Sequence, residues 1–165
     1  GLKEYAELVE GEEFYVIQYV KNPFSEKYFR KMRVFFVDGH IYPVVCHIDD
    51  VWNVHGDNRK ELMKKNKWMR EEEEAFVTDC RSYMGKEAFA VLQGLHEVIK
   101  LDFFGVDFTI MEDGAILIFE LNAVMRHHFD HSEHFPYLIP SLQNITNAFN
   151  KMLEDKILAS QKPES

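Results

Sequence analysis

The sequence predicts an α+β domain in which a mainly antiparallel sheet is flanked by helices, and three observations support this fold class. Two Asp-Gly pairs, at 38–39 and 113–114, each lie between runs of β-branched and aromatic residues, the pattern of two β-hairpins. Apolar residues repeat at helical spacing between and after these hairpins. The chain has 165 residues, 46% of them hydrophobic, which is enough for one domain with one core.

The first twenty residues predict two different elements. Residues 1–12 are expected to be the end of an upstream helix or a linker, because apolar side chains lie at helical spacing before Gly11. The next eight residues, EFYVIQYV (13–20), are β-branched and aromatic and predict a buried strand. Asn22 and Pro23 then predict a loop, since the residue before a proline avoids regular helical structure.

The first hairpin is expected over residues 28–48, with its turn at Asp38-Gly39. Pro43 lies inside its second strand and indicates an edge strand or a bulge, because proline cannot donate a ladder hydrogen bond. A charged helix is expected over 59–79, with the REEEEAF segment on its solvated side. A second, amphipathic helix is expected over about 86–100.

The second hairpin follows at residues 105–124, and a final helix is expected from near Pro136 to about 157, where apolar residues again keep helical spacing. Residues 158–165 are expected to form a disordered tail.

Composition narrows the class of protein. The formal net charge of −9 opposes binding to phosphate backbones, so we expect no nucleic-acid partner. No apolar run approaches the roughly 20 residues that span a bilayer, so we expect no membrane partner either. The two cysteines, Cys46 and Cys80, form no CxxC pair and favour a reducing, cytoplasmic setting with both thiols in the core.

The second hairpin carries three oxygen-bearing side chains, Asp107, Glu120 and Asn122, in strands that otherwise suit burial. With a two-residue loop at 113–114, Asp107 lies directly across from Glu120, and Asn122 shares the same face. A three-residue loop would shift the register and remove this convergence. Two like charges directly opposed destabilise a sheet, which favours a bound hard cation such as Mg²⁺. The alternative is a solvent-facing acidic surface that keeps the hairpin soluble.

A basic pair, Lys31 and Arg33, is expected on one face of the first hairpin's leading strand by alternation. Such a pair opposite an acidic trio suits a polyphosphate with its metal. The alternative is a salt bridge across the sheet.

The order of these segments resembles the C-terminal half of the ATP-grasp fold. The strand ending IQYV, the hairpin RVFFVDGHIYP, the helices and the segment LDFFGVDFTIMEDGAILIFELNAVM occur in that order, and Asp107, Glu120 and Asn122 match the D-x(12)-E-x-N spacing of this family. Within this family, the chain resembles uncharacterised bacterial ATP-grasp ligase-like proteins. The resemblance implies that residues 13–157 form an ATP-grasp C-terminal lobe.

The resemblance also implies roles for individual residues. Asp107, Glu120 and Asn122 would bind one or two Mg²⁺ ions on ATP. Arg33 would meet the transferred phosphate or an acyl-phosphate intermediate as the catalytic residue. The ATP-binding residues would be the hinge Gln18, Tyr19 and Val20, together with Lys31 and an apolar residue under the adenine, either Ile118 or Phe119.

The activity implied is that of an ATP- and Mg²⁺-dependent ligase, which joins a small-molecule carboxylate to an amine or thiol acceptor. The family's ATP site also uses lysines and a Gly-rich loop from an N-terminal lobe, and nothing before residue 13 supplies them. We therefore expect the chain to be a fragment of a longer enzyme that is inactive without its N-terminal lobe. Separating this lobe from the rest of the enzyme would expose an apolar surface, which favours a homo-oligomer of the chain.

Two alternatives remain from the sequence. The first is a nucleotide- or partner-binding pseudoenzyme module. The second is a transition-metal site in MRHHFDHSEHF, where His127 and His131 at i, i+4 could chelate Zn²⁺ or Ni²⁺ on a helix face, with His128 and His134 nearby. This segment lacks the HExxH pattern of zinc proteases. The competing interpretation, which we favour, is a polar loop beside the active site with one histidine, such as His128, near the substrate.

Overall fold

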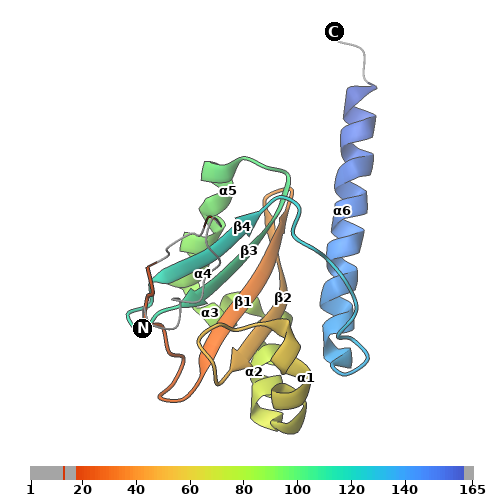
Figure 1. Cartoon of the computed structure of the whole chain (residues 1–165). Coiled ribbons are helices and arrows are strands. Elements are labelled where there is room, and N and C mark those ends of the chain that lie inside the picture. Colours follow the sequence, from red (N-terminus) through yellow and green to blue (C-terminus); the bar gives the residue numbers. More distant parts are fainter. Residues whose placement is uncertain (1–12, 14–17, 162–165) are drawn as a thin grey trace.

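A computed structural model describes residue 13 and residues 18–161, and the statements below concern these residues (Figure 1). Four antiparallel strands form one sheet in the order β2-β1-β3-β4. The α+β class with a mainly antiparallel sheet is therefore confirmed. The strands are β1 (Phe29–Val37), β2 (His40–Asp49), β3 (Phe103–Ile110) and β4 (Ile116–Asn122).

Helices fill the connection between β2 and β3 and the end of the chain. They are α1 (Gly56–Lys65), α2 (Lys67–Thr78), α3 (Cys80–Met84), α4 (Lys86–Gln93), α5 (Leu95–Ile99), the short 3₁₀ helix η2 (Pro136–Leu138) and α6 (Ile139–Ser160). The helices expected over 59–79 and 86–100 are present, but each is divided in two, at Asn66 and Gly94. Within the described residues, no helix combines the length and the hydropathy needed to span a membrane.

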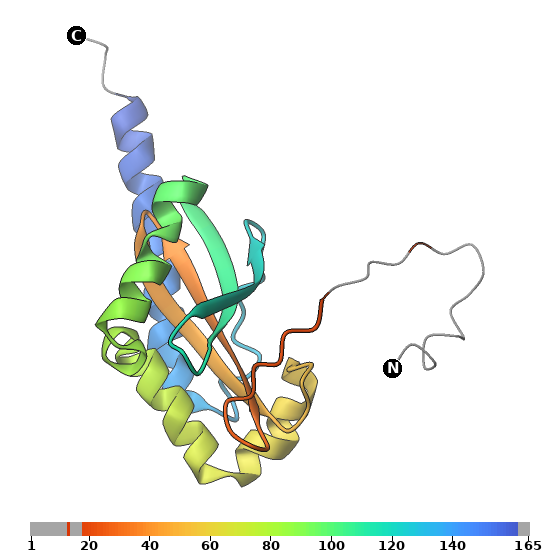
Figure 2. The ribbon, with the colours of Figure 1, turned by 90° about the vertical axis from the view of Figure 1, so that its left-hand side faces the viewer.

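The main core lies on one face of the sheet, where α2, α3 and α4 cover it (Figure 2). Alternation along β1 sends Met32, Val34 and Phe36 to this face, and all three are fully buried. Phe36 stacks on Phe104 of β3 with ring centroids 4.5 Å apart. Both cysteines are buried as expected, and burial raises the pKa of each thiol to about 12.

The opposite face is only partly covered. Helix α6 runs along the β2 side of the sheet (Figure 1) and contacts this face through Phe149, whose ring lies 4.9 Å from that of Phe103. Phe35 stacks on Phe103 beside this contact, with centroids 5.2 Å apart. Toward the start of β1 the same face carries Lys31 and Arg33 and is open. The candidate site lies there.

The first hairpin has the predicted turn. Asp38 and Gly39 both adopt positive φ, +49° and +76°, as a two-residue turn of the primed type requires, and Val37 pairs with His40. The prediction for Pro43 is also confirmed. Strand β2 is an edge strand, and its pairing with β1 shifts register next to Pro43.

The second hairpin has a different turn from the one predicted, but the predicted pairing of Asp107 with Glu120 is present. The loop has three residues, 112–114, because Met111 pairs with Ala115 through a 2.8 Å N–H···O=C bond. The predicted two-residue loop is therefore wrong. A β-bulge at Phe119 then restores the register, so Asp107 still lies directly across from Glu120.

Two expectations at the ends of the chain change. Residues 18–20 form no strand and are exposed, so the buried strand expected over 13–20 is wrong there, while 14–17 and the helix end expected over 1–12 lie outside the described residues. Helix α6 continues to Ser160, into the segment expected to be a tail, and residues 162–165 lie outside the described part.

Candidate functional site

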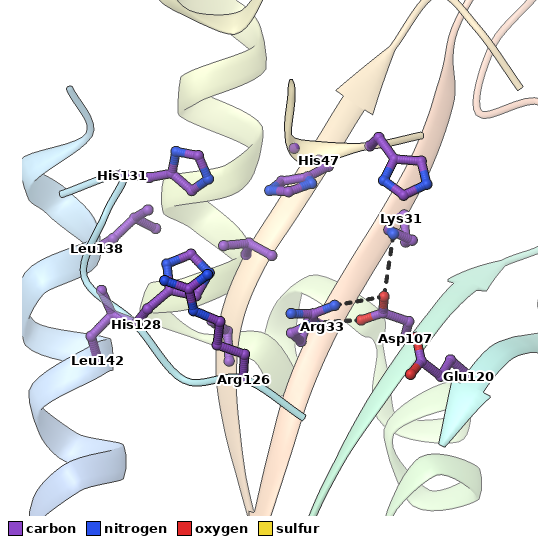
Figure 3. A pocket seen from close by; sticks show the side chains of 14 residues that line it. Lys31, Arg33, His47, Asp107, Glu120, Arg126, His128, His131, Leu138 and Leu142 are labelled. Carbon is purple, nitrogen blue, oxygen red and sulfur yellow. Dashed lines mark hydrogen bonds and ion pairs between the residues drawn. The ribbon is translucent and has the colours of Figure 1, made fainter. Parts of the chain in front are cut away.

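A pocket of about 250 Å³ opens on the partly covered face of the sheet, between the strands and the loop that leads to α6 (Figure 3). We call it the polar pocket. Lys31 and Arg33 of β1, with Asp107 and Glu120 of β3 and β4, form its strand side. The side opposite Asp107 and Glu120 is formed by strand β2, the start of α1, the loop before α6, and α6 itself. The polar residues on this side are His47, His55, Arg126, His128 and His131.

Asp107 is the centre of an ion-pair cluster on the strand side. Its side chain is only 2% exposed, and Arg33 donates to both of its oxygens, with Nε···Oδ1 at 2.6 Å and Nη2···Oδ2 at 2.9 Å. Lys31 Nζ lies 3.2 Å from Oδ2. Alternation therefore places Lys31 and Arg33 on one face as predicted. The salt bridge across the sheet, the alternative from the sequence, is the arrangement present.

Arg33 stays charged in this setting. Burial lowers the pKa of its guanidinium, but the hydrogen bonds and charge of Asp107, with the charge of Glu120, outweigh burial and raise the pKa overall. The fork geometry of the contact suits any planar or tetrahedral oxyanion that replaces the carboxylate.

The predicted metal ligands lie together only in part. Asp107 and Glu120 pair directly across the hairpin and both line the polar pocket. Asn122 contacts Glu120, donating from Nδ2 to Oε1 over 3.0 Å, while its Oδ1 accepts the N–H of Val124 at 2.8 Å; it does not line the pocket. In the part of the chain that the structure describes, no group of three or more His, Cys, Asp or Glu side chains is placed to hold a metal ion.

A second pocket of about 320 Å³ contains every residue expected to bind the nucleotide base. Gln18, Tyr19, Val20, Ile118 and Phe119 all line it, together with Trp52 and Leu117. We call it the apolar pocket. Its large side chains are unusually exposed: Tyr19 by 56%, Trp52 by 60% and Phe119 by 45%. The ring of Trp52 meets that of Tyr19 edge to face, 5.7 Å between centroids.

The two pockets share Lys31, which lines both. The bulge in β4 also connects them, because Phe119 lines the apolar pocket and its neighbour Glu120 lines the polar one. An elongated ligand can therefore contact both pockets along one side of the β1–β3–β4 surface.

The four histidines considered as a metal site, His127, His128, His131 and His134, do not point to one common position. Their segment consists of turns and irregular chain, so the helix face proposed for His127 and His131 is absent. His128 and His131 line the polar pocket. His127 turns elsewhere: its Nε2 lies 3.2 Å from Thr146 Oγ1, and its ring meets that of Phe35. His134 is not among the residues that line the pocket.

His47 is a site residue that the sequence analysis missed. It pairs with Lys31 in the β1–β2 ladder, so its side chain shares the face of Lys31 and Arg33. Continuing the predicted hairpin register past Pro43, with allowance for a bulge, could have found it. Arg126, His55 and Gly56 were also missed, and no local pattern marks them, since loops bring them to the pocket.

A buried ion pair supports the pocket from behind. Arg59 of α1 and Glu73 of α2 are fully buried and bonded through both carboxylate oxygens. Glu73 also accepts the N–H of Cys46 and the hydroxyl of Tyr137, each at 2.8 Å. Burial and the adjacent Glu73 charge raise the pKa of Tyr137, which keeps its hydroxyl a donor. The expectation that all four glutamates of REEEEAF face solvent is therefore wrong for Glu73.

No protein-family model matches the chain, and no curated protein matches it. A functional assignment therefore depends on the two pockets. Together they offer an exposed aromatic and aliphatic cavity, a lysine between the pockets, and a charged cavity with paired carboxylates and a guanidinium. This combination suits a ligand with a flat apolar end and an anionic end.

Proposed function

We propose that this chain is the C-terminal lobe of an ATP-grasp domain and forms the core of an ATP- and Mg²⁺-dependent ligase that joins a carboxylate to an amine or thiol through an acyl phosphate. The observation that carries the proposal is the juxtaposition of the two pockets. Residues chosen for the base line one pocket, residues chosen for phosphate and metal line the other, and Lys31 belongs to both.

The apolar pocket suits a purine. Flat aromatic faces and aliphatic side chains gain free energy when a base covers them, at about 25 cal/mol for each Å² removed from water. Residues 18–20 carry no sheet pairing, so their backbone N–H and C=O groups are free of ladder bonds and can read the edge of a base. Lys31 then contacts the phosphates where the base pocket meets the polar pocket.

The donor set on the second hairpin suits Mg²⁺ in its chemistry. Asp107, Glu120 and Asn122 supply hard oxygen donors, the type this ion prefers, and would hold it against the phosphates. When bound, Mg²⁺ supplies a Lewis acid that neutralises charge on the transferring phosphoryl group. Asp107 is neutralised by Arg33 and Lys31 in the structure, so ligand binding exchanges these ion pairs: the two cations turn to phosphate oxygens and Asp107 is released.

The reaction needs no nucleophilic side chain. A substrate carboxylate oxygen attacks the γ-phosphorus of ATP, the bond from that phosphorus to the β,γ-bridging oxygen breaks, and ADP leaves. The amine or thiol acceptor then attacks the acyl carbon, phosphate departs with the electron pair of the C–O bond, and the proton of the acceptor passes to the departing phosphate. Arg33 stabilises charge on the phosphoryl oxygens in both steps, and positioning supplies most of the acceleration in this class of reaction.

Calorimetric titration of Mg-ATP into the chain tests the proposal, with Asp107→Asn/Glu120→Gln as the site variant. Glu112→Gln is the matched control, because Glu112 is an exposed acid in the turn of the same hairpin. We expect the site variant to lose at least tenfold in affinity and the control to match the parent. The proposal fails if the chain does not bind Mg-ATP or if the site variant stays within threefold of the parent.

Tyr19→Ala separates the two pockets. It removes apolar surface from the base pocket without touching the charged cluster, so we expect weaker binding of ATP and unchanged binding of Mg²⁺-triphosphate. Equal loss for both ligands would contradict the placement of the base.

A further inference from the structure

The polar pocket has a second wall that the proposed nucleotide contacts do not use. Arg126, His128 and His131 come from the loop before α6, and His47 comes from β2 (Figure 3). We call these four residues the histidine wall. They lie across the pocket from Asp107 and Glu120, and no carboxylate on this side is among the lining residues that the structure describes.

The imidazoles of the histidine wall lie close to one another, and two of them have a ring nitrogen without a hydrogen bond in the described part of the chain. The ring centroids of His128 and His131 are 5.7 Å apart, and those of His47 and His131 are 6.4 Å apart. The Nδ1 atoms of His47 and His131 are buried, and neither has a hydrogen-bond partner among the described residues. Because Nδ1 is enclosed in both rings, a ligand in the pocket would bond these imidazoles through the opposite ring nitrogen, Nε2.

The first turn of α1 adds donors to the same wall. His55 and Gly56 line the pocket, and the side chain of His55 makes no capping bond to the helix. The first N–H groups of a helix carry partial positive charge and bind anions. Gly56 also leaves space, since a methyl group there would lie 3.6 Å from His131 Nε2 and 3.8 Å from His47 Cε1.

We infer that the histidine wall is the subsite for a compact oxyanion, a carboxylate or phosphate group, on the small-molecule substrate of this pocket. Arg126 supplies the permanent positive charge, and the imidazoles and the start of α1 supply hydrogen bonds. The identity of the ligand as a ligase substrate rests on the proposed function, whereas the anion subsite itself does not. Leu138 and Leu142 line the pocket on the same side as the histidine wall, so the substrate has a short apolar part beside its anionic group.

The wall has one acidic neighbour. Asp130 bonds Arg126 Nη2 at 3.0 Å and lies 3.3 Å from His128 Nδ1. Burial lowers the pKa of His47, His128 and His131, so these imidazoles are neutral near pH 7. The charged groups that face them, besides each other, are Lys31, Arg33, Arg59, Lys60, Arg126 and Asp130. A bound anion favours protonation, so binding takes up protons and strengthens as the pH falls.

The test titrates malonate and inorganic phosphate separately into isotope-labelled chain and follows the histidine ring resonances. We expect resonances of His47, His128 and His131 to shift, with affinity several-fold higher at pH 6 than at pH 8. The stronger of the two probes identifies the anion as carboxylate or phosphate. If these rings stay unmoved by both probes, or if only His40 and His134 respond, the inference is refuted.

Variants separate the subsite from the proposed function. Arg126→Ala/His131→Gln should weaken probe binding at least tenfold and leave Mg-ATP affinity within threefold. His134→Gln is the matched control, a histidine of the same loop that does not line the pocket, and should bind the probe normally. Asp107→Asn/Glu120→Gln should do the reverse of the wall variant, losing Mg-ATP and keeping the probe.

Gly56→Ala provides a variant that changes no charge. Its methyl group fills the space beside His131 and His47, so we expect weaker probe binding in a chain that unfolds at the same urea concentration or higher. Normal probe binding in both Gly56→Ala and Arg126→Ala/His131→Gln would overturn the inference even if Mg-ATP binds as proposed.

Discussion

Removing one partner of the buried Arg59–Glu73 pair should destabilise the fold more than removing both. Both side chains are fully buried, so Arg59→Met leaves the Glu73 carboxylate in the core with only the Cys46 N–H and the Tyr137 hydroxyl as donors. Breaking a buried ion pair from one side costs about 3–5 kcal/mol.

The double variant Arg59→Met/Glu73→Leu removes both charges. Replacing a buried pair by apolar side chains gains about 1–4 kcal/mol in favourable cases. Against this, the Cys46 N–H and the Tyr137 hydroxyl lose their acceptor, at about 1–3 kcal/mol each. The two effects nearly offset, so the double variant should lose about 0–3 kcal/mol and be more stable than Arg59→Met. Tyr137→Phe in the parent removes one bond to a charged group and should cost about 1.5–3 kcal/mol.

Urea unfolding of the four chains measures these differences. A domain of this size has a slope near 2 kcal/mol per molar urea, so a 4 kcal/mol loss lowers the midpoint by roughly 2 M. Lys65→Met, which removes an exposed ion pair with Glu61, is the matched control and should leave the urea midpoint essentially unchanged. A double variant that is no more stable than Arg59→Met would refute the reasoning, because removing the Glu73 charge as well should relieve the cost of leaving that carboxylate buried without its partner.

Three further predictions concern other parts of the structure. Phe36→Ala empties a fully buried position stacked on Phe104 and should cost about 3–5 kcal/mol in urea unfolding. Gly105→Ala places its Cβ 2.8 Å from Met125 Cβ, so the same assay should show a loss of about 1–3 kcal/mol. Burial lowers the pKa of His47 in the folded chain, so the unfolded chain binds more protons as the pH falls. The contribution of His47 to the free energy of unfolding is therefore fully present above about pH 6.5 and declines below it, by at most about 1.4 kcal/mol per pH unit. Urea unfolding at several pH values should show a flatter decline for His47→Gln than for the parent.

The register of the site hairpin shows what local sequence can predict. The Asp-Gly pair located the turn, and the assumed two-residue loop paired Asp107 with Glu120. The loop has three residues, yet the pair survives because Phe119 is bulged. Bulges depend on how a strand packs and twists, which alternation along one strand does not reveal. The predicted pairing was correct, and the turn geometry used to derive it was not.

Burial of single polar residues was the hardest property to predict. Glu73 stands in a run of four glutamates that has the composition of a solvated face, and its partner Arg59 lies fourteen residues earlier in a different helix. His47 and the residues of the loop before α6 reach the pocket through long-range packing. Periodicity locates elements and their faces, whereas such pairings form only when elements meet.

The apolar pocket is a different case. Residues 18–20 were expected to belong to a strand, and they do not, yet they line a pocket with Ile118 and Phe119 as the resemblance implied. The order of motifs along the chain therefore predicted that these residues lie together, whereas secondary-structure propensity predicted the wrong element for residues 18–20.

The pairing of β1 with β3 has a consequence for the order of folding. The β1–β2 hairpin closes through a two-residue turn, but Arg33 and Asp107 are separated by 74 positions, with five helices between their strands. Contacts this distant in sequence carry a large loop-closure entropy and form late. The ion pair at the centre of the site thus forms in the step that completes the four-stranded sheet, and partly folded chains with an intact first hairpin have no site at all.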